Sequence, residues 1–144
     1  MLSKPCFYIS DYFERYRTEY YEALNRVRLY NDMTGWINFF LQATIETAKT
    51  ARRKFEKAVI FVEKMNKNVD SILGKNENVR KILDNFYENP IQETSELIEK
   101  IKVSKATINR TIASMIKQNI ITETTGNSRN RIYVIEEYLN IFKK

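Results

Sequence analysis

Residues 104–118 read SKATINRTIASMIKQ, and this stretch decides the fold. Isoleucine or methionine recurs at positions 108, 112, 115 and 116, and this spacing predicts an amphipathic helix over residues 105–118. Ser104 precedes the first turn, where a serine side chain can cap the helix. The outward face then carries basic, amide or small residues and no acid: Lys105, Ala106, Asn109, Arg110, Ala113, Ser114 and Lys117. Thr107 and Thr111 lie at its margin.

The neighbouring segments complete a recognisable order of elements. Apolar spacing predicts short helices over residues 78–88 and 93–101, and a tight turn at residues 102–104. Two β-rich runs, residues 120–125 and 131–135, flank a hairpin tip at Gly126. A last short helix covers residues 136–142. Three helices followed by a β-hairpin is the order of a winged helix-turn-helix.

The first half of the chain predicts longer helices and a separate part. One helix begins at Ser10 or Asp11 and ends near Arg28, and a second is capped by Thr34 and continues to about Val69. This second helix carries two apolar seams. The first consists of Trp36, Phe40, Ala43, Thr47, Ala51, Phe55, Ala58 and Val62. A second seam lies beside it: Ile37, Leu41, Ile45 and Ala48. The preceding helix can cover only one seam, so this half either dimerises or packs on a segment that this chain lacks.

The fold class is therefore mainly α, with a helical bundle fragment over residues 1–74 and a winged helix-turn-helix over residues 75–144. Gly74 marks the predicted boundary between these two domains.

The positive charge is concentrated in the second half. The chain has a net charge of +6, and residues 100–135 hold seven basic residues and one acid, Glu123. The remaining residues are therefore neutral overall. Localised charge of this kind is typical of a surface that binds a polyanion.

The composition excludes several classes of function. The chain has no histidine and a single cysteine. The absence of histidine excludes histidine-based acid–base catalysis and most zinc sites. A single cysteine excludes an internal disulfide. We therefore expect no catalytic residue, no metal and no cofactor. No apolar run is long enough to span a membrane, and we expect a cytoplasmic protein.

The predicted partner is double-stranded DNA. Small residues let a helix enter the major groove, where Asn can pair with adenine and Arg with guanine. The predicted groove contacts are Lys105, Thr107, Asn109, Arg110 and Ser114. The predicted phosphate contacts are Lys102, Lys117, Arg129 and Arg131. If about three of the outward cations meet phosphate, the log–log salt slope is about −3 per subunit, and a lone subunit binds at best at ~10⁻⁶ M. A winged helix that binds protein instead is the alternative, because a fold does not fix a function.

Three runs in the first half carry a family resemblance: YISDYFERYR at residues 8–17, YYEAL at residues 20–24 and GWINFFL at residues 35–41. They resemble the C-terminal part of Fic-family proteins, many of which continue through a long helix into a winged helix. The resemblance implies transfer of AMP from ATP to a protein hydroxyl, through a motif of the form HPFxxGNGRxxR. In the family this motif lies before the segment that matches residues 5–12.

Nothing in this chain matches that motif, so no catalytic residue of the family can be carried over. The chain resembles a truncated family member and is expected to have no AMP-transfer activity. We interpret it as a DNA-binding regulatory fragment with a homodimer contact through its Fic-type helices. The alternative is part of an AMP transferase whose catalytic half is absent here, with the winged helix binding a protein substrate or partner.

Overall fold

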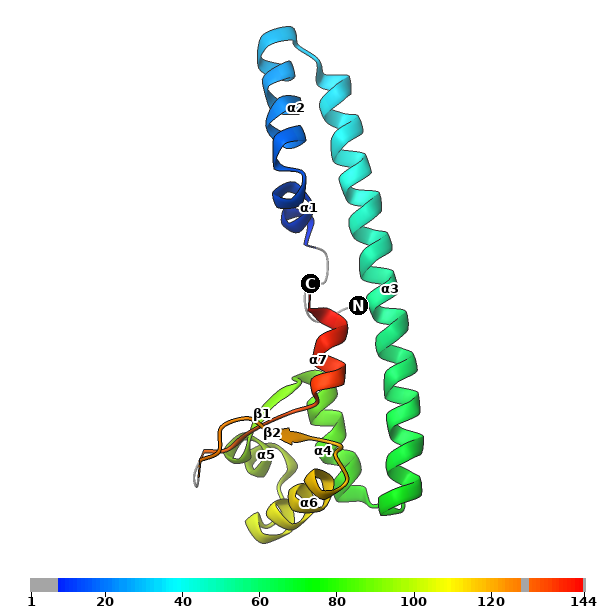
Figure 1. Ribbon diagram of the computed structural model, residues 1–144, viewed down its shortest axis with the longest axis vertical. Helices are drawn as coiled ribbons and strands as arrows, with labels where there is room; N and C mark the ends of the chain where they lie inside the picture. Colours follow the sequence, from blue (N-terminus) through cyan, green and yellow to red (C-terminus); the bar gives the residue numbers. More distant parts are fainter. Residues whose placement is uncertain (1–7, 128–129, 144) are drawn as a thin grey trace. The chain divides into compact units, whose positions relative to one another are not determined.

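The computed structural model describes residues 8–127 and 130–143 and confirms the predicted fold class. The chain is mainly helical with a small antiparallel sheet (Figure 1). It divides into two compact units, Met1–Glu56 and Lys57–Lys144, called here the N-terminal and C-terminal units. This division falls within helix α3 (Met33–Leu73), whereas the predicted domain boundary is Gly74.

The C-terminal unit packs its helices around one apolar core. Helices α4 (Glu77–Glu88), α5 (Thr94–Ile101) and α6 (Lys105–Lys117) each bury an apolar stripe, and the last part of α3 adds Phe61 and Val69. Asn76 caps α4, because its side chain accepts hydrogen bonds from the backbone N–H groups of Asn78 and Val79. Lys102 ends α5 in the left-handed conformation, with φ of 55°, so the chain turns sharply toward α6.

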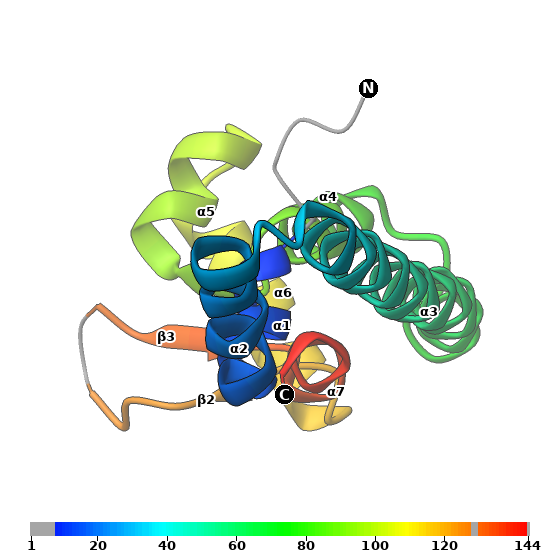
Figure 2. The ribbon, with the colours of Figure 1, turned by 90° about the horizontal axis from the view of Figure 1, so that it is seen from above.

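The sheet contains a strand that the sequence did not predict. Strand β3 (Ile132–Val134) lies between β1 (Ile91–Glu93) and β2 (Thr122–Glu123), and both pairs are antiparallel. The predicted hairpin is therefore present, with shorter strands, and Figure 2 shows β2 and β3 projecting together as a wing. The extra strand β1 is anchored by buried Gln92, which donates hydrogen bonds to the carbonyls of Asn85 and Asn89 at 3.0 Å.

Helix α7 (Glu136–Phe142) has the predicted bounds and is tied to the core by tyrosines. The Tyr138 hydroxyl donates to the backbone carbonyl of Tyr87 at 3.2 Å, and the Tyr87 hydroxyl donates to Asn66 Oδ1 at 3.1 Å. Burial raises the pKa of Tyr87 well above its ordinary value, so this hydroxyl stays protonated and remains a donor.

In the N-terminal unit, the prediction of one continuous first helix is wrong, because the structure has two helices there. Helices α1 (Ile9–Arg15) and α2 (Arg17–Tyr30) meet at Tyr16, whose φ of −110° and ψ of 47° are not helical. The break allows the rings of Phe13 and Tyr20 to stack, with centroids 4.9 Å apart. Aromatic pairing across the break therefore stabilises a bend that no glycine or proline marks.

The start of α3 also differs from the prediction. Asp32, and not Thr34, caps the helix, because its Oδ1 accepts a hydrogen bond from the Gly35 backbone N–H at 2.8 Å. Thr34 lies inside the helix. A side chain at position 35 would collide with the Asp32 carboxylate, so the cap requires glycine there.

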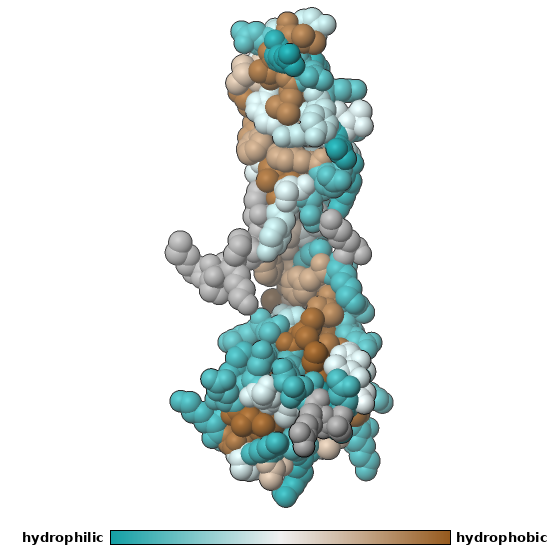
Figure 3. Space-filling model, turned by 90° about the vertical axis from the view of Figure 1, so that its left-hand side faces the viewer, coloured by the Kyte–Doolittle hydropathy of each residue, from teal (hydrophilic) through white to brown (hydrophobic). Residues whose placement is uncertain are grey.

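The N-terminal unit leaves much of its apolar surface exposed. Among described residues 8–56, only Ala43 is fully buried. The second predicted seam of α3 stays open, with Ile37, Leu41 and Ile45 exposed by 49%, 51% and 47%. Figure 3 shows apolar surface among the polar side chains on one face of the molecule. The first seam is only partly covered as well, since Phe40 and Phe55 are 42% and 37% exposed.

Candidate nucleic-acid interface

Helix α6 begins with a complete serine cap. The Ser104 hydroxyl accepts a hydrogen bond from the Thr107 backbone N–H at 3.2 Å and lies 2.8 Å from the Thr107 hydroxyl. The Thr111 hydroxyl donates to the Thr107 carbonyl at 2.9 Å. The predicted cap is therefore confirmed. The polar groups of Thr107 already bond within the helix, so this predicted groove contact has less hydrogen-bonding capacity left.

The two faces of α6 divide as the spacing predicts. Ile108, Ile112 and Met115 are buried, and Thr111 joins them at 8% exposure. The outward side chains are exposed, apart from Thr107 and Ser114, which are half-buried. The exposed set is Lys105, Ala106, Asn109, Arg110, Ala113 and Lys117. The structure therefore brings most of the predicted contact residues onto one continuous helix surface.

The cations of this surface are available to a partner. Among the residues that the structure describes, none of Lys102, Lys105, Arg110 and Lys117 forms an ion pair with an acidic side chain. Helix α6 has no acid in its first turn, and its N-terminus adds partial positive charge. An anion that approaches α6 therefore meets cations that acids have not neutralised.

The wing is less uniformly cationic than the sequence predicts. Arg131 Nε lies 3.8 Å from Glu123 Oε2 across the hairpin and donates to the Asn127 carbonyl at 2.8 Å. Glu123, the single acid of the basic window, thus offsets part of the wing's charge. Arg129 lies outside the described residues.

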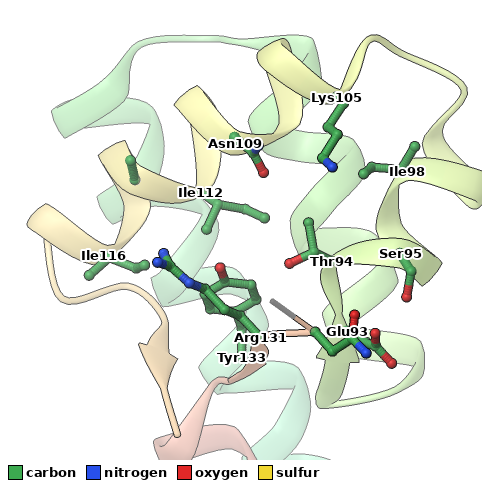
Figure 4. Close-up of a pocket in the computed structure, with 12 residues that line it drawn as sticks. Glu93, Thr94, Ser95, Ile98, Lys105, Asn109, Ile112, Ile116, Arg131 and Tyr133 are labelled. Atoms are coloured by element: carbon green, nitrogen blue, oxygen red, sulfur yellow. The ribbon is translucent and has the colours of Figure 1, made fainter. Parts of the chain in front are cut away.

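A groove of about 520 Å³ separates α6 from the wing. Lys105, Asn109 and Ala113 line it from α6, and Arg131 and Tyr133 line it from the wing. The start of α5 closes one end with Thr94 and Ser95, beside Glu93 of β1. Figure 4 shows the side chains of Lys105 and Asn109 directed from α6 toward this space, opposite the Tyr133 ring.

Sequence reasoning missed two groove residues of chemical interest, Glu93 and Tyr133. Tyr133 could have been found, because alternate residues of a strand share a face and Arg131 is two positions away. Glu93 could not, since the apolar spacing places it at the start of a helix, whereas in the structure it is both the last residue of β1 and the N-cap of α5.

The structure offers no sign of a metal site or a membrane span in residues 8–127 and 130–143. Within those residues, no three His, Cys, Asp or Glu side chains gather where they could hold a metal ion. None of the helices found there is both long and apolar enough to cross a bilayer.

Comparison with known proteins supports the winged-helix assignment. Residues 75–122 match the family described as winged helix-turn-helix DNA-binding, and this match spans α4, β1, α5, α6 and the start of β2. No curated protein matches the chain. The matched residues do not include residues 8–41, so the resemblance of that segment to Fic proteins stays a prediction. The chain carries a winged helix-turn-helix DNA-binding domain at residues 75–122.

Proposed function

We propose that this chain is a regulatory protein that binds double-stranded DNA by inserting α6 into the major groove. The observation that carries the proposal is the exposed, acid-free face of α6, whose cations have no acidic partner among the described residues. Asn109 and Arg110 are the residue types that pair with adenine and guanine edges. Lys102, Lys105 and Lys117 surround them and are suited to phosphate.

The salt dependence of duplex binding tests this proposal. With about three phosphate contacts per subunit, we expect the affinity for a random-sequence duplex to fall about 40-fold between 50 and 200 mM salt. Fluorescence anisotropy on a labelled duplex measures it directly. Absent binding, or binding that does not change with salt, contradicts the proposal and favours a protein-binding winged helix.

Arg110 tests base recognition separately. Once a preferred duplex has been selected, we expect Arg110→Ala to lose about 1–3 kcal/mol of binding free energy and to relax specificity at one base pair. Arg53→Ala is the matched control, because Arg53 is an exposed arginine on α3 in the N-terminal unit and should leave binding unchanged. Equal affinities of Arg110→Ala and the wild type for the preferred duplex would remove Arg110 from the base-reading set.

We propose further that two copies of the chain associate through the exposed seam of α3. Ile37, Leu41 and Ile45 recur every four residues, so each copy presents the same apolar stripe to the other. A pair of subunits also doubles the phosphate contacts of a weakly binding single domain. Sedimentation should show a dimer for the wild type and a monomer for Leu41→Glu with unchanged helix content. A monomeric wild type at tens of micromolar would contradict this.

We propose a relationship to Fic proteins from the sequence runs at residues 8–17, 20–24 and 35–41 alone. We infer that this chain has no AMP-transfer activity of its own, because it has no histidine to act as base. The uncovered seam of α3 also favours the second candidate, in which this chain is part of an AMP transferase and the winged helix binds a protein. Incubation with labelled ATP and acceptor proteins should give no transfer, and labelling by the chain alone would contradict the inference.

A further inference from the structure

The groove between α6 and the wing is lined by Tyr133, whose hydroxyl forms no hydrogen bond within the described residues. Tyr133 is 3% exposed, and among residues 8–127 and 130–143 its hydroxyl has no hydrogen-bond partner. The hydroxyl oxygen is not fully buried, so the small exposed area of Tyr133 includes this oxygen. Figure 4 shows it directed across the groove toward α6. The ring is therefore fixed by packing, and only its donor group is offered to a ligand.

Two cations line the same groove as this hydroxyl, from different elements. Lys105 belongs to the first turn of α6, and Arg131 belongs to the wing. The Arg131 Nε donates to the Asn127 carbonyl and lies 3.8 Å from Glu123 Oε2, while its Nη groups have no hydrogen-bond partner within the described residues. A neutral donor between two cations suits an anion with several acceptor oxygens, because each donor can bond a separate lone pair.

The shape of the groove selects among such anions. If α6 lies in the major groove, the duplex strand on the wing side runs beside the groove that α6 and the wing line. Its phosphates are the outermost atoms of that strand, while base edges are recessed. A concave surface beside α6 therefore meets a phosphodiester before it meets a base.

We propose that this groove seats one phosphodiester of the bound strand, with the Tyr133 hydroxyl donating a hydrogen bond to a phosphate oxygen and Lys105 and Arg131 supplying charge. The proposal rests on the proposed function, because it assigns a residue to the same DNA complex. Tyr133 fixes the register of the strand through a neutral hydrogen bond, and the cations hold it through salt-dependent attraction.

Glu93 completes the groove with a charge of the opposite sign. Its side chain is half-buried and forms no ion pair within the described residues. A carboxylate beside a phosphate is repulsive, so Glu93 restricts where in the groove the phosphate can lie. Glu93→Gln should therefore tighten duplex binding several-fold.

Binding of Tyr133→Phe to a duplex tests the proposal. The variant keeps the packed ring and loses only the hydroxyl, so we expect it to fold normally and to bind about 10-fold more weakly. Its salt slope should equal that of the wild type, because no charge changes. Lys105→Gln should instead reduce the slope by about one. Tyr30→Phe is the control, since Tyr30 is 76% exposed in the N-terminal unit.

A duplex with one neutral methylphosphonate, moved along the strand, identifies the seated phosphate. At the seated phosphate, the methylphosphonate should cost Tyr133→Phe less affinity than it costs the wild type, because the variant has already lost the hydrogen bond there. At the other contacted phosphates the cost should be the same for both proteins. If the wild type does not bind any duplex, the proposed function fails. If the wild type binds with the expected salt slope and Tyr133→Phe binds equally well, only the phosphate seat is wrong.

Discussion

Removing the three cations of α6 together should abolish most of the salt-sensitive part of DNA binding. We expect Lys105→Gln, Arg110→Gln and Lys117→Gln combined to bring the log–log salt slope per subunit from about −3 to about −1, because Lys102 and the wing arginines remain. These three side chains are exposed and unpaired among the described residues, so their loss removes no interaction within the fold. For each bound subunit, the wild type should lose about 40-fold in affinity between 50 and 200 mM salt, and the variant about 4-fold.

The matched control removes three cations from elsewhere. Lys64→Gln, Lys67→Gln and Lys75→Gln also lower the net charge by three, and these lysines are exposed and lie outside α6 and the wing. We expect the control to keep most of the wild-type slope. Equal slopes for the two triple variants would show that net charge, and not the placement of charge on α6, governs binding.

Phe86→Ala should have the largest effect on stability. Phe86 is 0% exposed and belongs to the core cluster of the C-terminal unit. Truncating a buried phenylalanine removes its apolar burial and leaves a cavity, which costs about 3–5 kcal/mol. Since small domains are stable by only about 5–15 kcal/mol, this variant should be close to unfolding in the C-terminal unit.

Urea denaturation followed by circular dichroism measures the change in the free energy of unfolding. Ile91→Ala is the control, because Ile91 is 46% exposed and its truncation should cost less than about 1 kcal/mol. A denaturation midpoint for Phe86→Ala equal to that of Ile91→Ala would contradict the assignment of Phe86 to the core. Loss of duplex binding should accompany the loss of stability, since α6 is held in place by this core.

The helices of the C-terminal unit were predictable because their signals are local. The apolar spacing of α6 and the Ser104 cap are both contained in one short stretch, and α7 has the predicted bounds. Strand β1 was missed because it has three residues and pairs with β3 some forty residues later. Nothing in its own sequence distinguishes it from the start of α5.

The errors in the N-terminal unit have a similar cause. The break at Tyr16 depends on rings that stack across it, and neither glycine nor proline marks the position. Asp32 and Thr34 are both capping residues, and the choice between them depends on the space that Gly35 leaves.

The candidate site was predictable as a helix face but not as a groove. The exposed face of α6 follows from periodicity. The pairing of Arg131 with Glu123 and the exposure of the Tyr133 hydroxyl depend on how the hairpin closes, which the residue spacing does not contain.

Amide chemical shifts of the labelled chain, followed during titration with a random duplex at low salt, test the central claim most directly. We expect the largest shifts in α6, at Arg131 and Tyr133 of the wing and at the start of α5, with little change in α7. Shifts confined to α7 or to the N-terminal helices, or no shifts at all, would contradict the account.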